Sequence, residues 1–277
     1  AGAALVDPGP STCLDTLRGM LREHGIAIGD VRTVLLTHIH LDHAGATGTL
    51  VRDNPDIQVY VHERGAPHMV DPTKLLRSAS RLYGDDMDRL WGEFLPVPRD
   101  NVQILGGGER ISVADRDFEV AYTPGHASHH VSFFDRSSGV AFVGDTAGIR
   151  TGADLFVMPP TPPPDIDIDA WKASVALIDR WGAETLFITH FGPHGDPATH
   201  LASLGQHLDG IAALAKTIVE RDVTDEERVN LFTDEARRYL QRHMADSAAA
   251  RYDQAAPLWQ CWLGLARYWK KHGVGGE

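Results

Sequence analysis

The chain has 277 residues and carries 26 basic and 38 acidic side chains, which give a formal net charge of −12. This acidic balance, with no basic block longer than Lys270-Lys271, argues against a nucleic-acid partner. No apolar run approaches the roughly 20 residues that span a bilayer, and no signal peptide is visible, so we also expect no membrane partner.

The two cysteines, Cys13 and Cys261, lie far apart and form no C-x-x-C pattern. We expect two buried free thiols rather than a disulfide, which fits a reducing, cytoplasmic location. The chain opens on AGAALVDPGP, which has the pattern of a strand end followed at once by a turn. Because a domain rarely starts in the middle of a strand, we expect one or two strands to precede this sequence.

Strand and helix patterns alternate in the first part of the chain. Residues 3–6, 31–37 and 57–61 are strand-like because β-branched and other apolar residues run together there. Residues 13–25 have helical apolar spacing and end at a glycine. Residues 63–95 are mostly helical, and the stretch DPTKLLRSASRLYG opens on a proline suited to a first helical turn.

A glycine-rich turn, LGGGER, begins a second β-rich part with the strand-like segments RISVA, FEVAYT, VSFF and VAFVG. The proline-rich stretch MPPTPPPDID (158–167) is expected to be a loop, residues 165–181 a helix and residues 185–189 a strand. From about residue 197 onward the pattern is helical. Two β-rich parts flanked by helices predict an α/β fold in which two sheets pack together and helices cover them.

The stretch LTHIHLDHAG (36–45) gathers three imidazoles and a carboxylate directly after a strand. His38 and His40 are two positions apart, and in an extended segment this spacing points both side chains the same way, so that they can share one ion. Asp42 and His43 follow, where the small residues 44–46 allow a helix to start. The stretch is either a histidine-rich turn or half of a metal site.

Three further strands also end in a residue that can bind a metal. His126 follows strand 117–123 in TPGHASHH, Asp145 follows strand 140–143 in VGDT, and His190 follows strand 185–189 in ITHFG. Each of these residues alone is more often a loop residue or a turn cap. Because a sheet holds groups at its strand ends rigidly, the four strand ends together predict one metal site.

Other histidines and aromatic residues allow more than one interpretation. His129 and His130 either hydrogen-bond a metal ligand, contact the substrate or serve packing, and His194 is a candidate for the pocket wall. For His62 and His68 we expect surface or capping roles. We expect the C-terminal aromatic cluster to serve helix packing or a homodimer interface: Trp259, Trp262, Tyr268 and Trp269.

The motifs THIHLDH, PGH, GD and THFG, in this order, resemble the metallo-β-lactamase superfamily. The resemblance implies an αββα sandwich over residues 1–200, with residues 201–277 as a helical C-terminal extension packed on the same domain. It also implies a two-metal site, in which Asp145 bridges the ions and Asp7, from LVDPG, supports the ligands without binding metal. One ion would be bound by His38, His40 and His126, and the other by Asp42, His43 and His190.

Two departures place the chain apart from the enzymes that degrade antibiotics. Those zinc enzymes typically lack the histidine that matches His43, and many carry a cysteine where Asp145 stands. Neither cysteine of this chain falls near a motif. The chain looks more like a branch of hydrolase-like members without a settled substrate, and β-lactam cleavage is not the activity we expect.

Imidazoles and carboxylates without a thiolate suit two divalent ions, and this donor set does not choose among Zn²⁺, Fe²⁺ and Mn²⁺. Zinc is the metal we expect, with iron or manganese as alternatives. Two ions about 3.5–4 Å apart can hold a bridging hydroxide at neutral pH, and Asp42 could orient this hydroxide and shuttle its proton. The expected activity is hydrolysis of a small-molecule ester, thioester or lactone. The alternatives are an iron-dependent redox reaction, either oxygen reduction or sulfur oxygenation, and phosphodiester hydrolysis.

Overall fold

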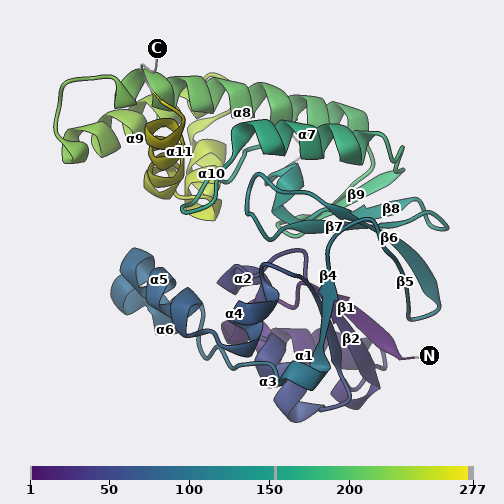
Figure 1. Cartoon of the computed structure of the whole chain (residues 1–277). Coiled ribbons are helices and arrows are strands. Elements are labelled where there is room, and N and C mark those ends of the chain that lie inside the picture. The colour runs from purple at the N-terminus through teal and green to yellow at the C-terminus, as the bar shows by residue number, and fades with distance from the viewer. Residues whose placement is uncertain (1, 153–154, 274–277) are drawn as a thin grey trace. The chain divides into compact units, whose positions relative to one another are not determined.

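The structure is a computed structural model that describes residues 2–152 and 155–273 (Figure 1). By compactness the chain divides into unit 1, residues 1–122 and 129–142, and unit 2, residues 123–128 and 143–277. This division does not test the predicted boundary near residue 200, where the helical extension was expected to begin, and that boundary stays a prediction. Each unit is described by itself.

Unit 1 contains two sheets. The first is parallel, in the order β1-β2-β3-β4, with bounds Ala3–Val6, Val31–Leu35, Gln58–His62 and Val102–Leu105. The second is antiparallel and runs through β5 (Arg110–Val113), β6 (Arg116–Tyr122), β7 (Val131–Asp135) and β8 (Val140–Phe142). Val34 pairs with Val59 in the first sheet, and Val120 pairs with Phe133 in the second.

The alternation of side chains along a strand explains how these sheets pack. In β3, Val59 and Val61 join a core cluster with helix residues, whereas Tyr60 points to the opposite face and packs against a cluster from the second sheet. Phe118 and Phe133 belong to that second cluster. Helices therefore cover one face of the parallel sheet, and the antiparallel sheet packs on the other.

The helices of unit 1 are short. They are α1 (Leu14–Glu23), α2 (Leu41–Ala44), α3 (Thr47–Asp53), α4 (Ala66–Val70), α5 (Thr73–Tyr83) and α6 (Met87–Leu90). Four 3-10 turns lie between these helices and the strands or between two helices: η1 (Ser11–Cys13), η2 (Ile28–Asp30), η3 (Gly84–Asp86), which joins α5 to α6, and η4 (Arg99–Asn101).

Unit 2 is mostly helical. It holds the turn η5 (Gly144–Ala147), the hairpin β9 (Thr185–Ile188) and β10 (Gly192–His194), and the helices α7 (Ile168–Asp179), α8 (Pro197–Val219), α9 (Asp225–Gln241), α10 (Asp246–Ala255) and α11 (Leu258–His272). Trp171, Phe232 and Trp262 are buried in a core cluster shared by these helices. The long helix α8 lies centrally and contacts α7, α9 and α11.

Most expected elements are confirmed within a few residues of their predicted ends, including the helical region after residue 197. Two strands were missed. β4 has only four residues, VQIL, and only Leu105 of them is buried, so it is too short to show a strand pattern of its own; β10 has three residues and contains a proline. Residues 159–167 form no helix or strand, which confirms the expected proline-rich loop.

Three further expectations have an outcome. Both cysteines are free, but Cys13 is exposed, so only Cys261 is the buried thiol we expected. For His62 a surface or capping role was expected. It is not at the surface, because it ends strand β3 and stacks on Tyr122 with ring centroids 4.5 Å apart. Its Nδ1 does accept from the backbone N–H of Arg64 at 3.2 Å, as a capping residue would. Among the described helices, none combines the length and apolar character needed to cross a membrane.

Gly48 allows α3 to approach the chain at Leu95. A Cβ atom at Gly48 would lie 2.1 Å from the Leu95 carbonyl oxygen, whereas a Cβ at Gly205 in α8 would meet nothing within 4 Å. We expect Gly48→Ala to lower the free energy of unfolding by about 1–3 kcal/mol through overpacking. Gly205→Ala should raise it by up to about 1 kcal/mol, because alanine favours the helix. Denaturant unfolding checks both signs, and a neutral or stabilising Gly48→Ala would contradict this packing.

His207 in α8 makes the stability of the protein depend on pH. Its Nδ1 lies 2.9 Å from the Tyr239 hydroxyl, and burial lowers the pKa of His207 from 6.5 to about 4. Between these two values the unfolded chain binds more protons than the folded chain, so the free energy of unfolding decreases as pH falls. From pH 7 to pH 4.5 the loss attributable to this residue should be about 2 kcal/mol.

The measurement is denaturant unfolding at both pH values for the wild type, His207→Gln and His24→Gln. The loss should shrink in His207→Gln because the group that titrates is gone. It should persist in His24→Gln, since His24 is exposed. An unchanged loss in His207→Gln would show that other groups cause the pH dependence.

Candidate functional site

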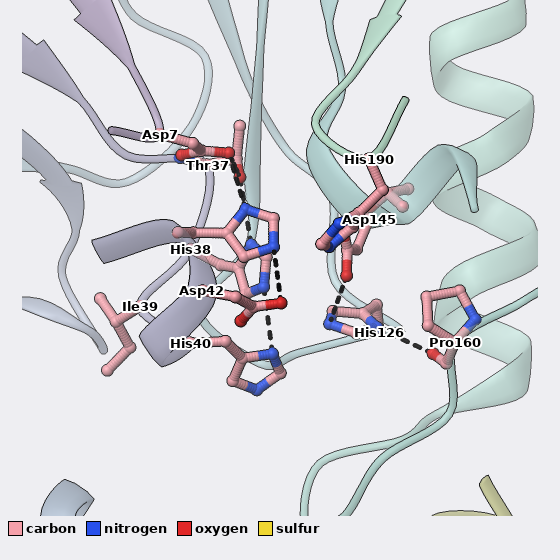
Figure 2. Close-up of polar contacts among 12 residues, drawn as sticks. Asp7, Thr37, His38, Ile39, His40, Asp42, His126, Asp145, Pro160 and His190 are labelled. Carbon is pink, nitrogen blue, oxygen red and sulfur yellow. Dashed lines mark hydrogen bonds and ion pairs between the residues drawn. The ribbon is translucent and has the colours of Figure 1, made fainter. Parts of the chain in front are cut away.

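In unit 1, strand β2 ends at Leu35 and the metal-binding candidates follow before and within α2. His38 is fully buried, and its Nε2 lies 3.0 Å from Nδ1 of His40, so both rings point to the same side as the spacing predicted (Figure 2). Two nitrogens that bind one tetrahedral Zn²⁺ at about 2.0–2.1 Å lie roughly 3.3 Å apart. The two rings are therefore placed as a pair of ligands to one ion would be.

The carboxylate of Asp7 organises this segment from the end of β1. Its Oδ1 accepts from the backbone N–H of Thr37 at 2.7 Å, and its Oδ2 accepts from the Thr37 hydroxyl at 2.6 Å. The same Oδ2 lies 2.9 Å from Nδ1 of His43. Asp7, His38 and His43 each offer a ligand atom within 4.8 Å of one another. The existing hydrogen bonds of Asp7 favour a supporting role for it.

Asp7 also determines which nitrogen of His43 can bind a metal. A neutral ring that donates from Nδ1 to a carboxylate presents a lone pair at Nε2, and metal-binding histidines are commonly held in this way. Nε2 of His43 lies 3.7 Å from Oδ2 of Asp42, whose side chain is 31% exposed. His43 and Asp42 thus form a second pair of potential ligands in unit 1.

His129 and His130 lie against the first pair. The ring of His130 stacks on that of His38 with centroids 5.0 Å apart, and the ring of His129 lies 6.1 Å from His38. The backbone N–H of Ile39 donates to Nδ1 of His129 at 3.5 Å. Both residues are buried, and both contact His38. A residue that supports a metal ligand must contact that ligand, so this position is compatible with the predicted supporting role, which stays a prediction.

In unit 2, Asp145 lies between two imidazoles (Figure 2). Its Oδ2 is 3.5 Å from Nε2 of His126, and its Oδ1 is 3.5 Å from Nε2 of His190. Nδ1 of His126 lies 2.9 Å from the Pro160 carbonyl and can only donate to it, so a neutral His126 has a lone pair at Nε2. A lone pair that faces a carboxylate oxygen at this distance suits a shared cation, and the donor set therefore fits a divalent metal.

The backbone explains why His126 sits where it does. Gly125 has φ +136°, and a Cβ at this position would lie 2.3 Å from atoms of Trp171. The Gly125 carbonyl accepts from the backbone N–H of Asp167 at 2.9 Å, and the Pro124 carbonyl accepts from the Ser174 hydroxyl at 2.6 Å. Glycine is thus required for the loop to lie directly on the start of α7.

His194 lies on β10, opposite Leu186 of β9, and its ring centroid is 5.1 Å from that of His200. Burial lowers the pKa of His194. Its expected place in the pocket wall stays a prediction. His200 and Trp171, which contact the segments that carry Asp145 and His126, were not singled out in the sequence, because each sits in an ordinary helical pattern without a motif.

Comparisons with known proteins agree with these motifs. One relative, a protein called hydroxyacylglutathione hydrolase from Buchnera aphidicola, is 30% identical over 116 residues, which are 42% of this chain and 33% of the relative. Another, the metallo-beta-lactamase fold-containing protein ST1585 from Sulfurisphaera tokodaii, is 30% identical over 145 residues, 51% of this chain and 53% of the relative. The matches therefore span only about a third to a half of these relatives.

The fold is similar to that of a solved metallo-beta-lactamase family protein, TTHA1429 from Thermus thermophilus. The TM-score is 0.71 at 23% identity, over 99% of this chain and 89% of the other. This likeness confirms the predicted fold class, an αββα sandwich with a helical C-terminal region. The family model described as metallo-beta-lactamase superfamily matches residues 1–190. The chain belongs to the metallo-beta-lactamase superfamily.

Proposed function

We propose that the protein is a metal-dependent hydrolase that binds two divalent ions and cleaves a small ester, thioester or lactone. The observation that carries the proposal is the position of Asp145. Each of its carboxylate oxygens faces the Nε2 atom of a different histidine at 3.5 Å, an arrangement in which one carboxylate can bridge two ions.

The proposed division of ligands follows the pairs found inside each unit. One ion would take the pair His38 and His40 together with His126, and the other the pair Asp42 and His43 together with His190. Two distances inside unit 1 support these pairs: 3.0 Å between His38 Nε2 and His40 Nδ1, and 3.7 Å between His43 Nε2 and an oxygen of Asp42. The assignment of His126 and His190 from unit 2 to these pairs of unit 1 follows the ligand pattern of the superfamily.

The other residues of the site would have supporting tasks. Two bound divalent ions would supply hydroxide from water at neutral pH and polarise the substrate carbonyl. Asp42, partly exposed, can accept a proton from the attacking water and release it to solvent. Asp7 keeps His43 in the tautomer that has its lone pair on Nε2. The name of one relative, hydroxyacylglutathione hydrolase, favours a thioester within this class of substrates.

We propose zinc as the native metal. The set of imidazoles and carboxylates without a thiolate suits zinc, and it suits iron and manganese as well. The metal is also what separates hydrolysis from the redox alternative. Iron as the sole metal, with oxygen consumed during turnover, would favour the redox reaction.

Loss of the bridging carboxylate should cost more metal than loss of one terminal ligand. We expect about two ions per chain in the wild type, about one in His40→Ala and fewer than one in Asp145→Ala. Elemental analysis of the purified proteins, together with denaturant unfolding of their metal-free forms, makes the comparison. Retention of two ions by Asp145→Ala would contradict the bridging assignment.

The substrate class is tested with a panel of thioesters, lactones, simple esters, β-lactams and phosphodiesters. The zinc-loaded wild type should hydrolyse a member of the first three groups, lose the activity in a chelator and regain it with Zn²⁺. Asp42→Asn should lower kcat about 10²–10⁴-fold even with excess Zn²⁺, because it removes both the proton acceptor and a proposed ligand of the second ion. Hydrolysis confined to phosphodiesters or β-lactams, or no hydrolysis with two ions bound, would overturn the proposal.

A further inference from the structure

The turn that carries Asp145 ends in two buried carbonyls. Residues 144–147 form the short 3-10 turn η5, and the carbonyls of Thr146 and Ala147 lie at its C-terminal end. The last carbonyls of a helical turn have no partner within the turn, and a buried carbonyl without a donor is costly. Whatever donates to these two oxygens therefore helps to hold Asp145 in place.

The donors are two aromatic ring N–H groups from different helices. Nε1 of Trp171, in α7, donates to the Thr146 carbonyl at 2.7 Å. Nε2 of His200, in α8, lies 2.8 Å from the Ala147 carbonyl, and because a carbonyl only accepts, this nitrogen carries the hydrogen. Both side chains are fully buried, so water does not compete for either carbonyl.

Trp171 also contacts the loop that carries His126. The rings of Trp171 and His126 meet edge to face, with centroids 5.7 Å apart and planes at 76°. The Thr146 hydroxyl donates to the Thr123 carbonyl at 2.9 Å and so ties the two loops directly. A single indole therefore spans the segments that carry His126 and Asp145, whose side chains face each other at 3.5 Å.

His200 is a costly choice if packing is its only task. Burial lowers its pKa to about 4, so the ring is neutral near pH 7. Its Nδ1 is buried and has no hydrogen-bond partner among the described residues. An apolar side chain would avoid the cost of that unsatisfied nitrogen, but it could not donate to the Ala147 carbonyl. The donor function thus accounts for a histidine at this position.

We propose that Trp171 and His200 are positioning residues for the metal site: by holding the carbonyls of Thr146 and Ala147, they keep the carboxylate of Asp145 between His126 and His190. This inference rests on the proposed function, because it assumes that these three residues bind metal. It adds two residues that bind no metal themselves and yet determine metal affinity. Hydrogen bonds that orient metal ligands typically change metal affinity 10–100-fold when they are removed.

The first test compares Trp171→Phe with Trp262→Phe. Both tryptophans are buried in the same core cluster, but the ring contact of Trp262 is with Phe232. We expect a 10–100-fold weaker zinc affinity in Trp171→Phe only, measured by competition between full-length protein and a chromophoric chelator for Zn²⁺. Denaturant unfolding of the metal-free proteins should show that both variants fold, with Trp171→Phe the less stable because the buried Thr146 carbonyl loses its donor, so that a loss of affinity is not merely a loss of fold.

The second test uses His200 and applies even if Trp171→Phe does not fold. In His200→Gln the side-chain N–H₂ group can replace Nε2 as a donor to the Ala147 carbonyl, whereas His200→Leu has no donor. Zinc affinity should fall in His200→Leu and recover, at least partly, in His200→Gln. Equal affinities in these two variants would show that His200 acts only by packing.

The outcomes separate the two proposals. If the wild type binds no zinc above background, the proposed metal site fails. If the wild type binds zinc and Trp171→Phe binds it equally well, or if Trp262→Phe weakens binding to the same extent, only the positioning role is overturned.

Discussion

The buried carboxylate of Asp145, with an imidazole nitrogen 3.5 Å from each of its oxygens, is the constraint on which the candidate site depends. A buried charge is costly unless opposite charge or hydrogen-bond donors compensate for it. Because the neutral His126 ring donates its Nδ1–H to the Pro160 carbonyl, its Nε2, the atom that faces Asp145, carries no hydrogen to donate. A cation between carboxylate and imidazole would supply the compensation that a neutral His126 does not.

The buried charge of Asp7 is compensated in a different way, by hydrogen-bond donors. A backbone N–H, a hydroxyl and an imidazole all lie at hydrogen-bond distance from its oxygens. Its charge is compensated without a metal, and it can therefore fix the ring of His43 while leaving Nε2 of that ring for another partner. The surroundings of each carboxylate, rather than residue type, distinguish the supporting Asp7 from the bridging candidate Asp145.

The sequence predicted the parts of this arrangement that depend on local pattern. The alternation of apolar residues indicated most strands, and the i, i+2 spacing of His38 and His40 correctly indicated that their rings share one side. Burial of His62 and exposure of Cys13 could not be predicted, because both depend on which distant segment packs beside them. Strand β4 was missed for a related reason: a strand of only four residues is recognised by its pairing with β3, not by its own pattern.

The residues that position Asp145 were harder still to find, because nothing in their local sequence distinguishes them. Trp171 and His200 lie in α7 and α8, where an aromatic residue on an apolar face normally signifies core packing. Each does pack in the interior, and each also uses one ring N–H to hold a carbonyl of η5. Core packing fixes the rings of Trp171 and His200, and these rings fix the turn η5. The helices of unit 2 therefore do more than cover apolar surface. They hold rigid a turn that contains glycine and would otherwise be free to move the carboxylate of Asp145.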